Sequence, residues 1–210
     1  MTHDLKSSNN DMTIDINKSS IIRHDVCEAA SRGNMVVDLG CGKRKVPGSI
    51  GIDHCQNIGV DIIVDMESCK LPLPSSSVDI VWADQLVEHI RNLIPLMAEI
   101  QRILKPGGQF IAKTPYFRSA YAVVDPTHVR SFSIMSMDYY CESKYLFKQY
   151  GFFSPGFSSL QIRLDSDFSK FANQLMCLAA RRAIANPRSF ENSPLSFMFP
   201  FSSITYSLIK

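Results

Sequence analysis

The apolar residues of the chain fall into short runs that are separated by polar, glycine- or proline-containing stretches. Short apolar runs bounded by turn residues are typical of buried β-strands. On this basis we expect strands at residues 35–40, 49–53, 60–65, 78–84, 109–115, 157–165 and 202–210. Each of the first five expected strands is followed by an acidic residue, a glycine or a polar loop.

Helical periodicity occupies several of the intervals between these runs. We expect helices at about 19–31, from about 92 to 104, at about 133–150 and at about 169–185. The second carries one apolar stripe, formed by Leu93, Leu96, Met97, Ile100 and Leu104. The Lys-Pro-Gly-Gly segment at 105–108 should end that helix. Strands that alternate with helices predict an α/β fold around a mostly parallel sheet.

The polar stretch of residues 1–18 predicts a flexible N-terminal arm, and residues 19–210 have the length of one domain. The arm lacks the apolar centre of a signal peptide, and no window is long and apolar enough for a membrane-spanning helix. The six cysteines contain no C-x-x-C pair, so we expect free thiols and no metal site. These features favour a cytoplasmic protein.

The formal net charge of +2 is too small to indicate a nucleic-acid partner. Two short basic clusters, at 43–45 and 181–182, are typical of solvated surface.

Candidate ligand-binding residues follow the expected strands. In parallel sheets of this kind, ligands bind outside the carboxyl ends of the strands. Gly40 and Gly42 follow the first strand, where glycine allows a sharp turn and a close approach of a ligand to the backbone. Asp53 ends the second strand, where a carboxylate can accept hydrogen bonds from both hydroxyls of a ribose.

The order of these motifs resembles a known family. The segments DLGCG, GID, VDIIVDMESCKLPLPSSSVDIVWADQLVEHI and AEIQRILKPGGQFIAKTP are together similar to the class I S-adenosylmethionine-dependent methyltransferases. Within that family the chain resembles the subgroup with a Leu/Val-Glu-His segment after the fourth strand and a Leu-Lys-Pro-Gly-Gly turn before the fifth. The resemblance covers about residues 34–140.

The resemblance implies a Rossmann-like sheet of seven strands with helices on both faces. The last strand would be antiparallel and inserted between the fifth and the sixth. It also implies S-adenosyl-L-methionine as cofactor. The residues that would bind it are Asp38, Gly40, Gly42 and Asp84 on the methionine side, Asp53 at the ribose, and Asp65 with Met66 at the adenine.

Two departures from the family pattern stand out. The third glycine of the loop is missing, because Lys43 and Arg44 follow Gly42. The connection from Gly42 to Ser49 is also shorter than a parallel crossover normally needs, so either the first helix is reduced to a turn or the second strand pairs less fully. The missing glycine also argues against a dehydrogenase, whose fingerprint is G-x-G-x-x-G.

The loop at 116–132 should select the acceptor, because it follows the fifth strand. His128, three residues after Asp125, is our first candidate for a general base toward an acceptor hydroxyl, since its ordinary pKa is near 6.5. Asp125 either orients His128 or caps the turn that holds it. His89 is the second candidate base. The expected substrate-binding residues are Tyr116, Tyr121 and Arg130.

We expect a transferase that methylates a small-molecule or sugar acceptor, and a homo-oligomer is compatible with the apolar segment at 195–201. That segment could instead cover the edge of the sheet. Two other hypotheses remain open: a methyltransferase of protein or RNA, and a non-catalytic relative that binds a partner.

Overall fold

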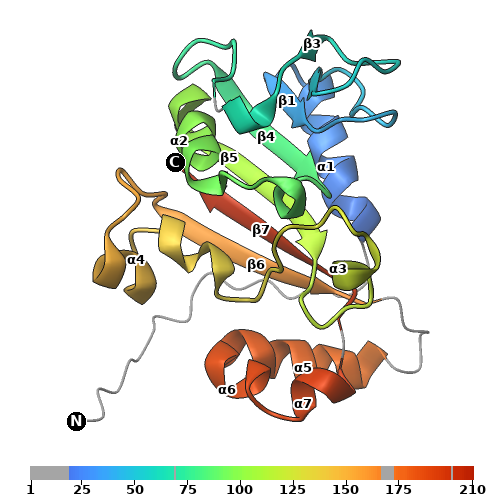
Figure 1. Ribbon diagram of the computed structural model, residues 1–210, viewed down its shortest axis with the longest axis vertical. Coiled ribbons are helices and arrows are strands. Elements are labelled where there is room, and N and C mark those ends of the chain that lie inside the picture. The colour runs from blue at the N-terminus through green and yellow to red at the C-terminus, as the bar shows by residue number, and fades with distance from the viewer. Residues whose placement is uncertain (1–18, 69, 167–172, 200) are drawn as a thin grey trace.

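The computed structural model describes residues 19–68, 70–166, 173–199 and 201–210. Within these residues, seven strands form one sheet in the order β3-β2-β1-β4-β5-β7-β6 (Figure 1). The strands are β1 (Val36–Leu39), β2 (Ile50–Asp53), β3 (Ile62–Ile63), β4 (Val78–Asp84), β5 (Leu104–Pro115), β6 (Ser159–Asp165) and β7 (Ser203–Ile209). Strands β1 to β5 pair in parallel, and β7 pairs antiparallel with β5 and β6. The expected fold class and the inserted last strand are confirmed.

Helices cover both faces of this sheet. Successive residues of a strand point to opposite faces, so β4 and β5 contribute to a core on each side. On one face, Val81 and Phe110 belong to the larger apolar cluster, to which α2 (Leu93–Ile103) and α5 (Asn173–Ala185) also contribute. On the other face, Trp82 and Ile111 pack with Val26 of α1 (Ser19–Ser31). Figure 1 shows α1 and α2 on opposite sides of the central strands.

The connection between β1 and β2 contains no helix, so the first of the two alternatives holds. Residues 40–49 form turns, and the backbone amide of Val46 donates a hydrogen bond of 2.7 Å to Oδ2 of Asp38. Val46 itself is fully buried. Strand β2 still pairs with β1 over three residue pairs, from Val37–Ile50 to Leu39–Ile52.

The prediction of one continuous helix at 133–150 is wrong. The structure has a 3-10 helix, η3 (Ser136–Tyr140), and a short helix, α4 (Tyr145–Tyr150). Between them, the backbone of Phe157 accepts a hydrogen bond from Glu142 and donates one to Tyr140. This strand-like bridge uses backbone groups that a continuous helix would need for its own hydrogen bonds.

Two strands also have other bounds than expected. Strand β3 is shorter than residues 60–65, and β5 begins at Leu104, so the Lys-Pro-Gly-Gly segment lies inside the strand. The N-terminal arm and the expected start of the helix at 169 lie outside the described residues. None of the helices that the structure describes is long and apolar enough to cross a membrane.

The C-terminal region forms a small helical group below the sheet in Figure 1, made of α5, α6 (Pro187–Glu191) and α7 (Leu195–Met198). In the apolar segment at 195–201, Phe201 is fully buried in the larger cluster, whereas Phe197 and Met198 are exposed. Leu195 and Phe199 also pack, partly buried, against this cluster. The segment is therefore anchored to the core and leaves Phe197 and Met198 at the surface.

Candidate active site

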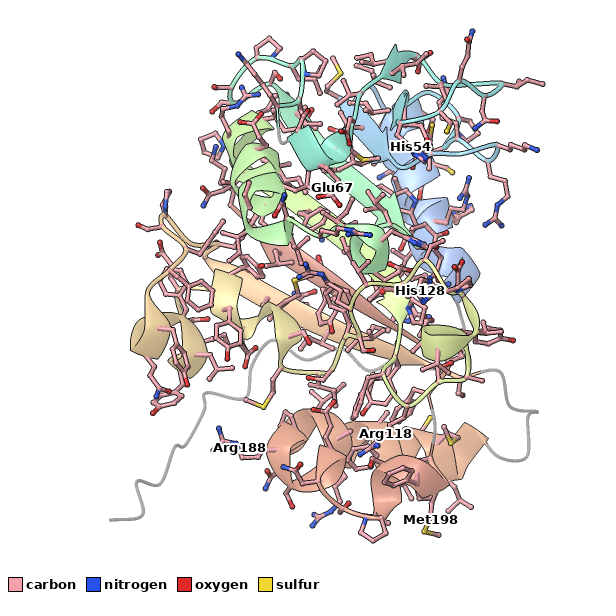
Figure 2. All side chains as sticks on the ribbon, viewed as in Figure 1. His54, Glu67, Arg118, His128, Arg188 and Met198 are labelled. Atoms are coloured by element: carbon pink, nitrogen blue, oxygen red, sulfur yellow. The ribbon has the colours of Figure 1, made fainter. Side chains whose placement is uncertain are left out.

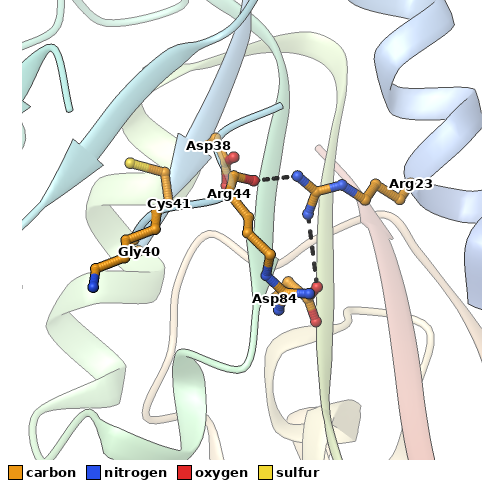
Figure 3. A pocket seen from close by; sticks show the side chains of 8 residues that line it. Arg23, Asp38, Gly40, Cys41, Arg44 and Asp84 are labelled. Atoms are coloured by element: carbon orange, nitrogen blue, oxygen red, sulfur yellow. Dashed lines mark hydrogen bonds and ion pairs between the residues drawn. The ribbon is translucent and has the colours of Figure 1, made fainter. Parts of the chain in front are cut away.

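A cavity of about 560 Å³ lies at the carboxyl ends of β1 and β4 (Figure 3). Its volume is in the range of small-molecule and cofactor sites. The lining residues are Arg23, Asp38, Gly40, Cys41, Gly42, Lys43, Arg44 and Asp84. Four of the seven residues expected to bind the cofactor therefore line one cavity.

Gly40 and Gly42 have the left-handed backbone that the sharp turn after β1 requires, with φ of 73° and 52°. They differ in what surrounds them. A Cβ atom on Gly40 would lie 2.9 Å from Cδ1 of Leu86, so this glycine allows the turn to pack against the segment after β4. A Cβ atom on Gly42 would meet nothing within 4 Å. Gly42 therefore leaves open space on a cavity wall.

Asp38 holds the wall of the cavity in place. It is 2% exposed, and one of its oxygens accepts the hydrogen bond from Val46. Burial raises the pKa of Asp38 to about 6, although the Val46 hydrogen bond and the nearby Arg23 oppose this shift. The Asp38 carboxyl group therefore takes up a proton at a higher pH than an exposed aspartate does.

Asp53 lies beside the cavity rather than on its lining. Its Oδ2 accepts a hydrogen bond of 2.8 Å from the backbone amide of Gly42, and its Oδ1 accepts one of 3.1 Å from Cys55. His54 approaches Oδ1 to 3.0 Å through Nδ1. Asp53 thus fixes the glycine turn that forms the cavity wall.

The two residues expected at the adenine are not on the lining either. Asp65 directly precedes η1 (Met66–Ser68), and its Oδ1 accepts a hydrogen bond of 3.0 Å from the amide of Glu67. Met66 is 4% exposed and belongs to the larger apolar cluster. In this structure Asp65 stabilises the turn, and Met66 packs in the core.

Sequence analysis missed the arginines of the cavity. Arg23 comes from α1, its guanidinium lies 4.0 Å from a carboxylate oxygen of Asp84, and it also donates a hydrogen bond to the carbonyl of Arg44 (Figure 3). Arg23 lies in the first helix, outside the recognised motifs. Arg44 belongs to a basic cluster that resembles ordinary surface. No sequence pattern distinguished either of them.

On the acceptor side, the structure brings the two candidate bases together. The rings of His89 and His128 meet edge to face, with centroids 4.7 Å apart and an angle of 67° between their planes. His89 lies in η2 (Val87–His89) after β4, and His128 lies in the loop after α3 (Tyr121–Val124), where Figure 2 labels it. The amide of Val129 donates a hydrogen bond to the carbonyl of Glu88, which ties the two segments together.

Hydrogen bonds define which ring nitrogen carries the proton in each neutral histidine. Nδ1 of His128 lies 3.2 Å from the carbonyl oxygen of Ala122, so it is the donor. Nδ1 of His89 lies 3.0 Å from Oγ1 of Thr127, whose own hydroxyl donates to Asp125 at 2.6 Å. Thr127 therefore accepts from His89. In both rings the lone pair is left on Nε2.

Asp125 caps the turn that holds His128 and does not hydrogen-bond the His128 ring. Its Oδ1 accepts from both the amide and the hydroxyl of Thr127. These hydrogen bonds lower the pKa of the Asp125 carboxyl group. Of the two roles expected for Asp125, the structure has the capping role, and through Thr127 it also orients His89.

Glu88 completes the group, and sequence analysis did not single it out. It is 1% exposed, and Oε2 accepts a hydrogen bond of 2.9 Å from Thr114. Within the described residues Oε1 has no hydrogen-bond partner. Burial raises the pKa of Glu88 to about 6. A buried carboxylate oxygen without a partner is costly, which makes Glu88 a further candidate residue of the site.

The expected substrate-binding residues are spread apart. Tyr116 is fully buried, and its hydroxyl donates to Oε1 of Glu191 at 3.0 Å, so it lies in the core. Tyr121 is 57% exposed on α3. Arg130 donates to the backbone carbonyl of Arg91 beside η2.

Part of the chain matches a known family of protein domains. Residues 37–112 match the model of a methyltransferase domain. A sterol 4-C-methyltransferase of Caenorhabditis elegans is 33% identical over 90 residues, which cover 38% of this chain and 27% of that protein. A dimethylglycine N-methyltransferase of Parasynechococcus marenigrum is 26% identical over 114 residues, which cover 43% of this chain and 41% of that protein. The chain thus spans less than half the length of these two relatives.

A solved structure shares the fold. The S-adenosylmethionine-dependent methyltransferase from Archaeoglobus fulgidus superposes with a TM-score of 0.56 at 18% identity, covering 90% of this chain and 94% of that one. The chain therefore shares the fold of that methyltransferase, and its residues 37–112 match a methyltransferase domain.

Proposed function

We propose that this protein transfers the methyl group of S-adenosyl-L-methionine to a hydroxyl group of a small-molecule or sugar acceptor. The observation that carries the proposal is the pairing of two sites at one edge of the sheet. The cavity lies at the ends of β1 and β4, and His89 lies in η2, the next element after β4, with His128 against its ring. Asp84 lines the cavity and lies three residues before Val87, the first residue of η2, so it links the two sites along the chain.

The residues of the cavity fit the cofactor. Open space above Gly42 lets a ligand approach the backbone, and the guanidinium of Arg23 suits a carboxylate such as that of the methionine part. Asp84 offers a carboxylate to an amino group. We place the ribose near Asp53, and the adenine near Asp65 and Met66. When bound, the cofactor supplies a methyl group that its positively charged sulfur already activates.

We assign activation of the acceptor to His128 and His89, because each presents an Nε2 lone pair. Asp125 acts as a positioning residue on His89 through Thr127. Tyr121 and Arg130 are proposed to contact the acceptor, since they lie in or beside the same loop. Tyr116 is better explained as a core residue.

The named relatives act on carbon and nitrogen acceptors, as their names state. The proposal of an oxygen acceptor for this chain rests on the two imidazoles. Removal of a proton is required for most hydroxyl acceptors, whereas an amine can react with its own lone pair. A positioned base contributes most where a hydroxyl has to lose its proton.

The test uses S-adenosylmethionine labelled in its methyl group and panels of sugars, phenols and amines. We expect label in a hydroxyl-bearing acceptor, with one equivalent of S-adenosylhomocysteine formed. The change His128→Ala should lower kcat by about 10²- to 10⁴-fold and leave cofactor affinity nearly unchanged. His24→Ala is the matched control, because His24 is exposed on α1. Transfer to amines alone, at a rate that His128→Ala does not change, would overturn the proposed acceptor class.

A further inference from the structure

Glu88, His89 and His128 form a compact group of potential metal ligands. One ligand atom from each residue lies within 4.8 Å of the corresponding atom of the other two. Glu88 is buried at the base of this group, and the two histidines are partly exposed. The group is therefore closed on the protein side and accessible from solvent.

We propose that these three residues bind a divalent transition-metal ion, of the zinc or iron type, which activates the acceptor hydroxyl. Two imidazoles and one carboxylate are a donor set for such ions, whereas magnesium and calcium prefer oxygen ligands alone. The activation of the hydroxyl by the metal rests on the proposed function. The binding of the metal does not, because it follows from the ligand atoms themselves.

The hydrogen bonds around the group are those of a metal site. Metal-bound histidines commonly donate their second ring N–H to a carbonyl or an acceptor side chain, which fixes the ring and leaves the other nitrogen for the metal. His128 does so with Ala122, and His89 does so with Thr127. Asp125 in turn accepts a hydrogen bond from the Thr127 hydroxyl, so a chain of hydrogen bonds runs from His89 through Thr127 to Asp125.

Glu88 supplies an independent observation. Its side chain is almost completely buried, yet Oε1 has no hydrogen-bond partner among the described residues. Thr114 holds the other oxygen at 2.9 Å. A bound cation would provide the missing partner for Oε1 and would explain why a carboxylate is buried at this point.

The spacing is compatible with coordination. Three atoms within 4.8 Å of one another have a common centre at most about 2.8 Å from each, and zinc–ligand distances are about 2.0–2.2 Å. Movements of less than about 1 Å in side chains would complete the site. Three protein ligands leave a coordination position for an external oxygen, as in catalytic rather than structural metal sites.

The chemistry follows from that open position. A hydroxyl bound to a divalent cation loses its proton to water near neutral pH, because the cation stabilises the resulting oxyanion. The oxyanion then forms the new O–C bond with the methyl carbon, and the electron pair of the broken C–S bond stays on sulfur. In this arrangement His128 acts as a ligand rather than as the free base that the sequence predicts.

The binding test uses Zn²⁺ alone, without cofactor or acceptor. Calorimetric titration should show one site per chain, and Glu88→Gln, His89→Gln and His128→Gln should each weaken binding at least tenfold. The matched control is His24→Gln, since His24, Asp25 and Glu28 form a second but fully exposed group. The variant Cys55→Ser tests whether an exposed thiol accounts for binding. Circular dichroism verifies that each variant is folded.

A second variant distinguishes a metal site from a structural cluster. Thr127→Val keeps all three ligands but removes the nearer acceptor of His89, the Thr127 hydroxyl at 3.0 Å, and leaves only the Thr127 carbonyl at 3.4 Å. It should lower Zn²⁺ affinity by about 10- to 100-fold. Equal binding in the parent and the three ligand variants, or equal loss in His24→Gln, would overturn the site, as would the absence of binding. If Zn²⁺ binds as expected and no acceptor is methylated, the metal site stands and the proposed function fails. Full methyl transfer by chelator-treated protein would overturn the activating role.

Discussion

The backbone amide of Gly42 donates a hydrogen bond of 2.8 Å to Oδ2 of Asp53, eleven residues further along the chain. This contact joins the turn after β1 to the end of β2. One carboxylate therefore has two tasks in our account. It holds the glycine turn in place, and we propose that it also receives the ribose of the cofactor.

Asp53→Ala should weaken binding of S-adenosylmethionine by about 10- to 100-fold, because charge-assisted hydrogen bonds of about 1.5–3 kcal/mol are lost. Calorimetry measures this. The control is Asp61→Ala, since Asp61 also accepts a backbone hydrogen bond, from Gly51, but lies outside the cavity lining. Equal affinities of the Asp53 variant and the parent would remove the ribose assignment.

Gly42→Ala should reduce cofactor affinity at least tenfold, because the added Cβ projects into the open space on the cavity wall. Gly107→Ala is the control. Gly107 also has a left-handed backbone, with φ of 77°, and also has no atom within 4 Å of an added Cβ, but it lies away from the cavity. Both changes should cost about 1 kcal/mol of unfolding free energy through backbone strain. If both variants bind the cofactor like the parent, Gly42 does not border the site.

Much of this fold could be predicted, because apolar runs and turn residues are local signals. The seven strands, α1 and α2 all follow from them. The split helix at 133–150 could not be predicted in this way. Its cause is the backbone bridge to Phe157, which lies beyond the segment and has no local signature.

The candidate site was predictable to a similar degree. Asp38, Gly40, Gly42 and Asp84 were found because their order along the chain resembles a family. Arg23 was missed because it lies in α1, outside the motifs, and only the packing of α1 against the sheet brings it to the cavity. Glu88 was missed because its burial and its unpaired oxygen are properties of the folded chain.

Tyr116→Phe should destabilise the fold by about 1–3 kcal/mol, because the buried carboxylate of Glu191 loses a hydrogen-bond donor. Denaturant unfolding measures this loss. The KM for the acceptor should stay unchanged. Tyr121→Ala should have the reverse effect, a raised KM with little loss of stability, because Tyr121 is exposed in the acceptor loop. A raised KM in Tyr116→Phe with unchanged stability would return Tyr116 to the acceptor site.

Asp138→Asn should stabilise the protein above pH 6. Burial raises the pKa of Asp138 to about 6, although Lys144 opposes the shift. Because the folded-state pKa exceeds the unfolded one, the folded protein binds more protons between pH 4 and 6, and its stability falls as the pH rises through this window.

Asp138→Asn removes the titrating group, so the stability of this variant does not fall as the pH rises from 4 to 6. Relative to the parent, it should gain at most about 3 kcal/mol between pH 4 and pH 7, from about 2.2 pH units at 1.36 kcal/mol each. Urea unfolding of both proteins at the two pH values provides the comparison. A constant difference between them across this range would contradict the raised pKa.

The central claim, that the cavity at the ends of β1 and β4 binds S-adenosylmethionine, is tested most directly by equilibrium dialysis of the full chain against the labelled cofactor. The account predicts one saturable site per chain, from which S-adenosylhomocysteine displaces the label. A folded parent protein that retains no label at any cofactor concentration would contradict it.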